Sequence, residues 1–128
     1  NLSMKLRRLP DTELEVLKAL WAAGGETPRS VLEEALASHG WATNTVNTYL
    51  TRLTKKGVIA CRKLGKSNYY TPLVTREEYQ AFEGRAVLDQ LFGSSLKGFV
   101  ASLAGDGRVD QAELEELQQY LEELTQDK

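Results

Sequence analysis

The sequence predicts a mainly α-helical protein, with three helices and a β-hairpin in residues 1–74 and three further helices in residues 75–128. Three observations support this fold class. Apolar residues recur at the helical period in six stretches. Gly, Pro, Ser and Thr between those stretches mark short connections. Finally, β-branched and tyrosine residues flank a turn-forming segment at residues 65–68, as expected of two paired strands.

The first two helices are short and amphipathic. Residues 11–23 place four apolar side chains on one face: Leu14, Leu17, Leu20 and Trp21. Glycines 24 and 25 end this helix. The second helix is expected to start at Thr27-Pro28, with Thr27 as the N-cap and Pro28 in the first helical position. Its apolar face comprises Val31, Leu32, Ala35 and Leu36.

The third helix has two contrasting faces. Thr43 suits its N-cap, and Gly57 suits the left-handed residue after its C-terminus. One face is apolar, with Val46, Leu50 and Leu53. The opposite face has short hydrogen-bonding side chains and a cation but no carboxylate: Asn44, Thr45, Asn47, Thr48, Thr51 and Arg52. Base edges and phosphates bind such groups, whereas they would repel a carboxylate.

A basic hairpin follows the third helix. Its first strand begins with residues 58–60, and residues 68–71 form the second, with Tyr69 and Tyr70 on opposite faces. Lys63 and Lys66 lie at or near the tip. Three helices joined by short loops and followed by a hairpin indicate a winged helix-turn-helix.

Charge is segregated along the chain. Residues 1–70 hold 11 Lys/Arg and 6 Asp/Glu, whereas residues 71–128 hold 5 and 12, for a net charge of −2. No acidic residue occurs between Ala35 and Arg76. This pattern predicts a surface for a polyanion, namely double-stranded DNA, in the first part of the chain.

The predicted DNA contacts follow from that surface. Base contacts are expected from Asn44, Thr45, Asn47, Thr48 and Arg52. Phosphate contacts are expected from Thr43, Thr51, Lys55, Lys56, Lys63 and Lys66. Alternatives are that Thr45 and Thr48 are ordinary helix surface, and that Arg52 pairs with Glu33 or Glu34. The basic segment with Lys5, Arg7 and Arg8 is either a phosphate-binding arm or a solvated terminus.

The last three helices are expected to form a dimer. Thr75 caps a helix that runs to about Phe92, residues 96–103 form a short helix, and Asp110 caps the last one with Glu113 at N3. Three helices of this size enclose little core, so a second copy is the simplest partner. The expected interface residues are Tyr79, Phe82, Leu88, Leu91, Phe92, Phe99, Val100, Leu114, Leu117 and Leu121. The alternative is a monomer whose tail folds back on its own head.

Other classes of function lack support in the sequence. No nucleophile–base motif or phosphate-binding loop indicates an enzyme, and no cofactor is expected. No apolar run is long enough for a membrane span, and no secretory signal is visible. The single Cys61 fits a cytoplasmic location, with a thiol switch left open. Residues 106–113 resemble half a calcium loop, but Ser102 and Ala104 are poor early ligands, so no metal is expected.

Four blocks of sequence together resemble the penicillinase-repressor family of BlaI, MecI and CopY type. They are LPDTELEVLKALW, TPRSVLEEAL, TVNTYLTRLTKKGVI and NYYTPLVTREEY, in the family's order and spacing. The resemblance implies a homodimeric transcriptional repressor whose winged-helix heads bind a palindromic operator and whose tails form the dimer. The alternative function is a winged helix that binds protein without sequence-specific DNA binding.

The resemblance also implies ways of ending repression. A sensor pathway cuts β-lactam-responsive members between Asn and Phe in the dimerisation segment. The matching pair here is Ser102-Leu103, a departure from that pattern. Copper-responsive members use a cysteine-rich C-terminal motif, and residues 71–128 contain no cysteine. The inducing signal therefore stays open. Pro10 replaces the family's usual Thr or Ser before the first helix, so Asp11 is expected to cap it.

Overall fold

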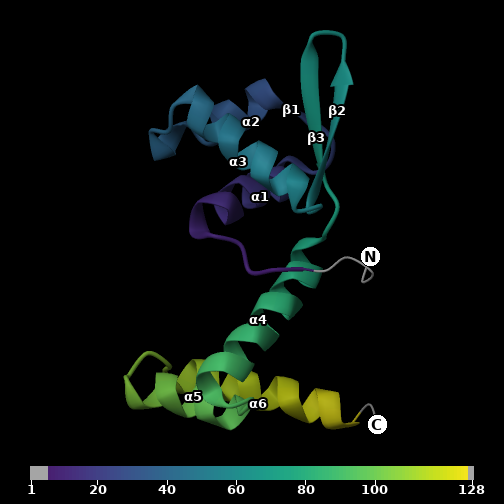
Figure 1. Cartoon of the computed structure of the whole chain (residues 1–128). Helices are drawn as coiled ribbons and strands as arrows, with labels where there is room; N and C mark the ends of the chain where they lie inside the picture. Colours follow the sequence, from purple (N-terminus) through teal and green to yellow (C-terminus); the bar gives the residue numbers. More distant parts are fainter. Residues whose placement is uncertain (1–5, 127–128) are drawn as a thin grey trace. The chain divides into compact units, whose positions relative to one another are not determined.

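The computed structural model describes residues 6–126, which form two compact units (Figure 1). The first unit ends at Glu83 and is called the head; the second begins at Gly84 and is called the tail. The division falls inside α4 (Arg76–Phe92), after the predicted boundary at residues 74/75. The reason is that Tyr79 and Phe82, in the first turns of α4, pack with the head core.

The head contains the predicted three helices and hairpin (Figure 1). Its elements before α4 are α1 (Asp11–Ala23), β1 (Thr27–Pro28), α2 (Arg29–Ala35), a 3₁₀ turn (Ala37–His39), α3 (Thr43–Lys55), β2 (Ile59–Leu64) and β3 (Ser67–Pro72). Gly57 has a φ of 78°, the left-handed conformation predicted for the residue after α3. The predicted winged helix-turn-helix fold is confirmed.

The sheet has three strands rather than the predicted two, in the order β1-β3-β2, all antiparallel. The hairpin register runs from Ile59 opposite Pro72 to Leu64 opposite Ser67, so the turn between the strands is only Gly65-Lys66. The prediction that Thr27-Pro28 opens the second helix is wrong, because these residues pair with Tyr70 and Tyr69 as β1.

The N-caps predicted for the first three helices are also wrong. Pro10, Pro28 and Ala42 occupy these positions, and none makes a side-chain cap bond. Ala42 has an extended backbone, and its carbonyl accepts from Thr45 and Val46, so Thr43 is already helical. The Thr27 hydroxyl instead donates to the Gly25 carbonyl at 2.8 Å. Asp11 lies within the first turn of α1, where its charge suits the helix dipole.

The head core is formed by the inner faces of α1, α2 and α3 with the root of the hairpin. Its fully buried side chains include Val16, Leu17, Leu20, Leu32, Leu50, Leu53 and Ile59. Val31, predicted for the apolar face of the second helix, is 45% exposed, and Ala35 of the same face is exposed too, so only Leu32 and Leu36 of this face are buried. Trp21 lies at the core edge, where its indole N–H donates to the Val74 carbonyl at 2.9 Å.

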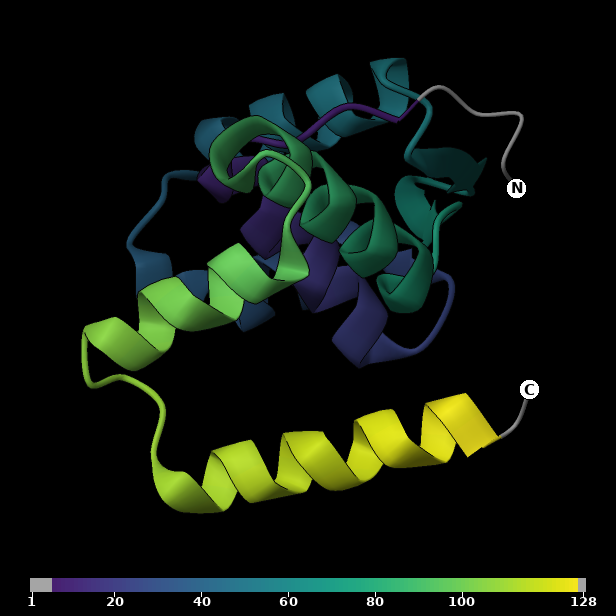
Figure 2. The same cartoon turned by 90° about the horizontal axis from the view of Figure 1, so that it is seen from below.

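The tail contains the end of α4 together with α5 (Leu96–Gly105) and α6 (Gln111–Gln126). Figure 2 shows α6, in yellow, running back in the opposite direction to α5. The capping box predicted for α6 is confirmed: Asp110 Oδ1 accepts from the Glu113 N–H at 2.9 Å, and Glu113 Oε1 accepts from the Asp110 N–H at 3.1 Å. Thr75 and Glu78 form the same box at the start of α4.

Candidate nucleic-acid interface

The face of α3 predicted to contact bases is open to solvent. Val46, Leu50 and Leu53 are anchored in the head core, which turns the opposite side of the helix outward. Five predicted contact residues on that side are exposed and one, Thr45, is half-buried; the exposed ones are Asn44, Asn47, Thr48, Thr51 and Arg52. The helix thus presents amide, hydroxyl and guanidinium groups together on one surface.

Two threonines on this face already use their hydroxyl protons. Thr48 donates to the Asn44 carbonyl, and Thr51 donates to the Asn47 carbonyl, each at 2.9 Å. A hydroxyl held in this way can still accept a hydrogen bond, for example from a base amino group. A phosphate oxygen only accepts, so the phosphate contact predicted for Thr51 requires its hydroxyl to rotate away from α3.

Among the described residues, no carboxylate pairs with the Arg52 guanidinium. The expected alternative was an ion pair between Arg52 and Glu33 or Glu34. In the structure Glu33 is paired with Arg29 from the start of α2, with 3.4 Å between Arg29 Nε and Glu33 Oε2. Arg29 also donates to Asn47 Oδ1 at 2.9 Å. No pattern in the sequence predicted this contact, because it joins side chains of two separate helices.

The wing carries two exposed lysines and one fixed arginine. Lys63 lies on β2, and Lys66 is in the turn, as predicted. Arg62 forms a two-point ion pair with Glu26, with distances of 2.8 and 2.7 Å. This pair lowers the pKa of the Glu26 carboxyl and raises the pKa of Arg62, mainly through their hydrogen bonds. Arg62 is thereby paired within the head, whereas Lys63 and Lys66 form no ion pair among the described residues.

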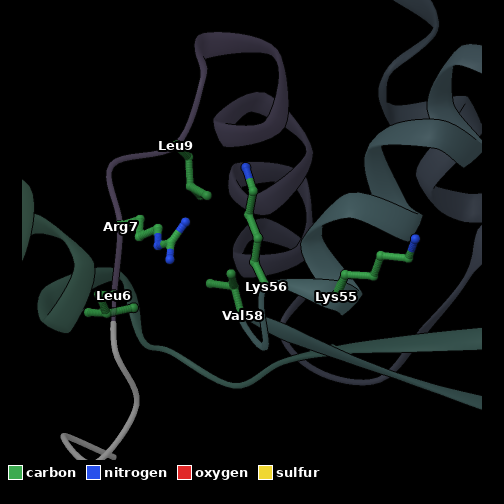
Figure 3. Close-up of a pocket in the computed structure, with 6 residues that line it drawn as sticks. All are labelled: Leu6, Arg7, Leu9, Lys55, Lys56 and Val58. Carbon is green, nitrogen blue, oxygen red and sulfur yellow. The ribbon is translucent and has the colours of Figure 1, made fainter.

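A basic pocket of about 300 Å³ lies beyond the end of α3 (Figure 3). Its lining is Leu6, Arg7, Leu9, Lys55, Lys56 and Val58. Lys55 points away from Lys56, whereas Lys56 reaches up toward α1 and bonds the Glu13 carboxylate. Glu13 is only 2% exposed, so the charge of Lys56 compensates a buried carboxylate. Among the predicted phosphate contacts, Lys56 is therefore the one whose ammonium group a protein carboxylate already binds.

The N-terminal arm is attached to the head through residues 8 and 9. Arg8 pairs with Glu83 at 3.3 Å, and the Leu9 N–H donates to the buried Tyr79 hydroxyl at 2.8 Å. Burial raises the pKa of Tyr79 to about 12. Of the three arm cations, Arg7 makes no ion pair among the described residues, and Lys5 lies outside them.

The predicted dimer residues divide into three groups. Tyr79 and Phe82 belong to the head, and Leu88 is buried. Phe92, Val100 and Leu114 are half-buried. Four remain exposed by 36 to 72%: Leu91, Phe99, Leu117 and Leu121. Three further apolar side chains of these helices are also exposed, although they were not among the expected interface residues: Leu96, Tyr120 and Leu124.

An apolar groove of about 380 Å³ separates α5 from α6. Its lining is Phe99, Val100, Leu103, Val109, Glu113, Glu116, Leu117 and Tyr120. Ser102, beside Leu103 at the candidate cleavage bond, is exposed, and both residues lie inside α5. A protease binds extended chain, so cleavage there requires α5 to open locally.

Other candidate sites offer little for chemistry. No three His, Cys, Asp or Glu residues within 6–126 are arranged to hold a metal ion. Cys61 is exposed on β2. Within the same range, no helix combines the length and apolarity needed to cross a membrane.

The fold and this surface define a winged helix-turn-helix protein with a helical C-terminal unit. The chain belongs to the penicillinase repressor family, whose model matches residues 9–123. It is 29% identical over 119 residues to the penicillinase repressor of Bacillus licheniformis, covering 93% of each chain. It is 25% identical over 117 residues to the methicillin resistance regulatory protein MecI of Staphylococcus aureus N315, covering 91% of this chain and 95% of that protein.

Two solved structures resemble the head. One is the DNA-binding domain of the repressor BlaI, with a TM-score of 0.52 and 33% identity. The other is the monomeric form of Bacillus licheniformis BlaI in complex with the blaP half-operator, with a TM-score of 0.50 and 32% identity. Each comparison covers 59% of this chain and 92% of the other. The family resemblance drawn from the sequence is confirmed.

Proposed function

We propose that this protein is a transcriptional repressor that binds a palindromic operator as a homodimer. The exposed, carboxylate-free face of α3 is the observation that carries the proposal, because it joins base-reading side chains to a basic wing. The similarity of the head to BlaI, whose structure in complex with a half-operator is known, supports the same role. Repression then follows from occupation of a promoter in the cytoplasm.

Each head places α3 in the major groove. Asn44, Thr45, Asn47, Thr48 and Arg52 face base edges, whereas Lys55, Lys63 and Lys66 bind phosphates and set the register. Lys56 binds a phosphate only when its ammonium group leaves the Glu13 carboxylate. Thr43 and Thr51 are the remaining phosphate contacts.

A second copy covers the exposed apolar side chains of the tail. Leu91 of α4 is 72% exposed and Leu121 of α6 is 49% exposed, and the exposed Phe99, Leu117 and Tyr120 line the groove between α5 and α6. Exposed apolar surface of this kind marks interaction sites in soluble proteins. Two joined heads would then read half-sites about one helical turn, roughly 10 base pairs, apart.

A signal of unknown chemistry ends repression. Cleavage between Ser102 and Leu103 by a sensor protease pathway is the candidate route, because it cuts α5 and breaks the tail. The chain has no assigned enzymatic role in this scheme; it is the target of the signal.

A gel shift with the DNA upstream of the protein's own gene tests this function. Sequence-specific binding is supported if a shifted complex forms and an excess of scrambled duplex of equal length does not displace the DNA. Equal binding to both duplexes, or no complex at low ionic strength, would instead favour a winged helix that binds protein.

Asn47→Ala tests base reading directly. Loss of a well-placed amide contact costs about 1–3 kcal/mol of discrimination at one base pair. Binding-site selection should therefore lose its preference at one position of each half-site. An unchanged selected sequence would remove Asn47 from the reading residues.

A further inference from the structure

A hydrogen bond links the recognition face of α3 to the first residue of α2. Arg29 Nη1 donates to Asn47 Oδ1 at 2.9 Å, while Arg29 Nε lies 3.4 Å from Glu33 Oε2. Glu33 thus holds the guanidinium from within α2, and the guanidinium holds the amide of Asn47. Among the described residues, Asn47 is the only predicted base-reading side chain that hydrogen-bonds a side chain of another helix.

This bond fixes which way the Asn47 amide faces. A guanidinium has hydrogen-bond donors and no acceptor, so only the amide oxygen can face it. The amide NH₂ group must then face away from Arg29. With Arg29 in place, Asn47 therefore offers donors to DNA in preference to its oxygen.

Arg29 also lies next to the wing. A polar hollow of about 180 Å³ joins the start of α2 to the hairpin turn, and Arg29 shares its lining with Lys66 and Asn68. β1 holds this arrangement together, because Pro28, the residue before Arg29, pairs with Tyr69 of β3. Arg29 is thus located between the two elements that face DNA in the proposed function.

We propose that Arg29 is a positioning residue that sets the base preference of Asn47. Recognition of adenine by asparagine uses both amide atoms, since the oxygen accepts from N6 and the NH₂ group donates to N7. With its oxygen held by Arg29, Asn47 disfavours adenine and favours an edge with acceptors only, such as guanine with O6 and N7. This inference rests on the proposed DNA binding and specifies how one residue of that surface reads sequence.

Binding-site selection with the full-length protein tests the inference. Wild-type protein should enrich guanine over adenine at the one base pair where Asn47→Ala removes the base preference. Arg29→Ala should lower the ratio of guanine to adenine at that base pair by about tenfold, which erases or reverses the preference. The base preferences at the other positions of the half-site should not change. Arg29→Lys retains a donor for the Asn47 oxygen and should restore much of the wild-type preference. In an Asn47→Ala background, Arg29→Ala should change no base preference further, because Arg29 acts through Asn47.

Arg85→Ala is the matched control. Arg85 forms the same kind of pair within a helix, 3.3 Å from Asp89 at i+4, but it lies in α4 of the tail. It should leave the selected sequence unchanged. Thermal melts of each variant establish that the head is folded before selection is compared.

Two results would overturn the inference. If Arg29→Ala selects the same bases as wild type and only weakens all DNA equally, Arg29 supplies charge alone, and the proposed function stands without it. If the wild-type protein selects no sequence, the proposed function fails and the inference fails with it.

Discussion

The salt dependence of operator affinity gives the most direct measure of the proposed DNA-binding surface of the head, and its magnitude follows from the structure. Each head offers four predicted phosphate-binding lysines, of which Lys56 is paired with the buried Glu13. The other three are exposed, so a dimer neutralises about six phosphates. The logarithm of affinity should fall with the logarithm of salt concentration with a slope of about −5, because each phosphate contributes about −0.9. Affinity should then drop about 10³-fold between 50 and 200 mM salt.

The matching perturbation removes the wing charges. Lys63→Ala with Lys66→Ala deletes four of the six contacts per dimer, so the slope should fall to about −2. Fluorescence anisotropy with a labelled operator duplex, titrated at several salt concentrations, measures both slopes. Lys97→Ala in the tail removes an exposed lysine from α5 and serves as the control with an unchanged slope.

Two results would refute this reasoning. A wild-type slope near zero would mean that the basic surface does not contact phosphates. An unchanged slope in the wing variant, together with a steep wild-type slope, would move the contacts away from the hairpin.

Three further predictions concern stability and assembly. Lys56→Met leaves the Glu13 carboxylate buried and unpaired. Removing one partner of a fully buried pair costs about 3–5 kcal/mol, and the partial exposure of Lys56 reduces the expected loss of unfolding free energy to about 2 kcal/mol, measured by urea unfolding. The control Lys55→Met should be nearly neutral. The folded pKa of Tyr79 is raised to about 12, so its contribution to stability is complete below pH 10 and disappears as the pH rises toward 12. The free energy of unfolding of Tyr79→Phe should therefore fall less steeply with pH over that range than that of the wild type. An identical pH profile for the two proteins would contradict the assignment. Leu117→Arg with Leu121→Arg should convert a dimer to monomers in sedimentation velocity and weaken operator binding, whereas Val31→Arg, at an equally exposed apolar position of the head, should do neither.

The sequence predicted the elements of the head well because their signals are local. Val46, Leu50 and Leu53 repeat at the helical period, and Gly57 has the positive φ that its position required. The family could be recognised because four such blocks occur in order. The capping box at residues 110–113 and the N-cap at Thr75 were also predicted, since both partners of each cap lie within one turn.

The errors arose where distant residues decide. Thr27 has the side chain of an N-cap, but its backbone pairs with Tyr70, 43 residues further along the chain. Arg29 pairs with Glu33, which was only an alternative partner for Arg52, and Arg29 also donates to Asn47 in the next helix. Neither contact leaves a periodic signal, because each depends on how separate elements pack.

The two outer strands of the sheet have a consequence for self-association. β1 contains only two residues, one of them a proline without an N–H group, and β2 carries Arg62 and Lys63 along its length. Short length, proline and charge all discourage one sheet from extending into another. If two heads bind neighbouring half-sites as proposed, their sheets therefore have little tendency to pair through backbone hydrogen bonds, and association of a second molecule depends on contacts elsewhere in the chain.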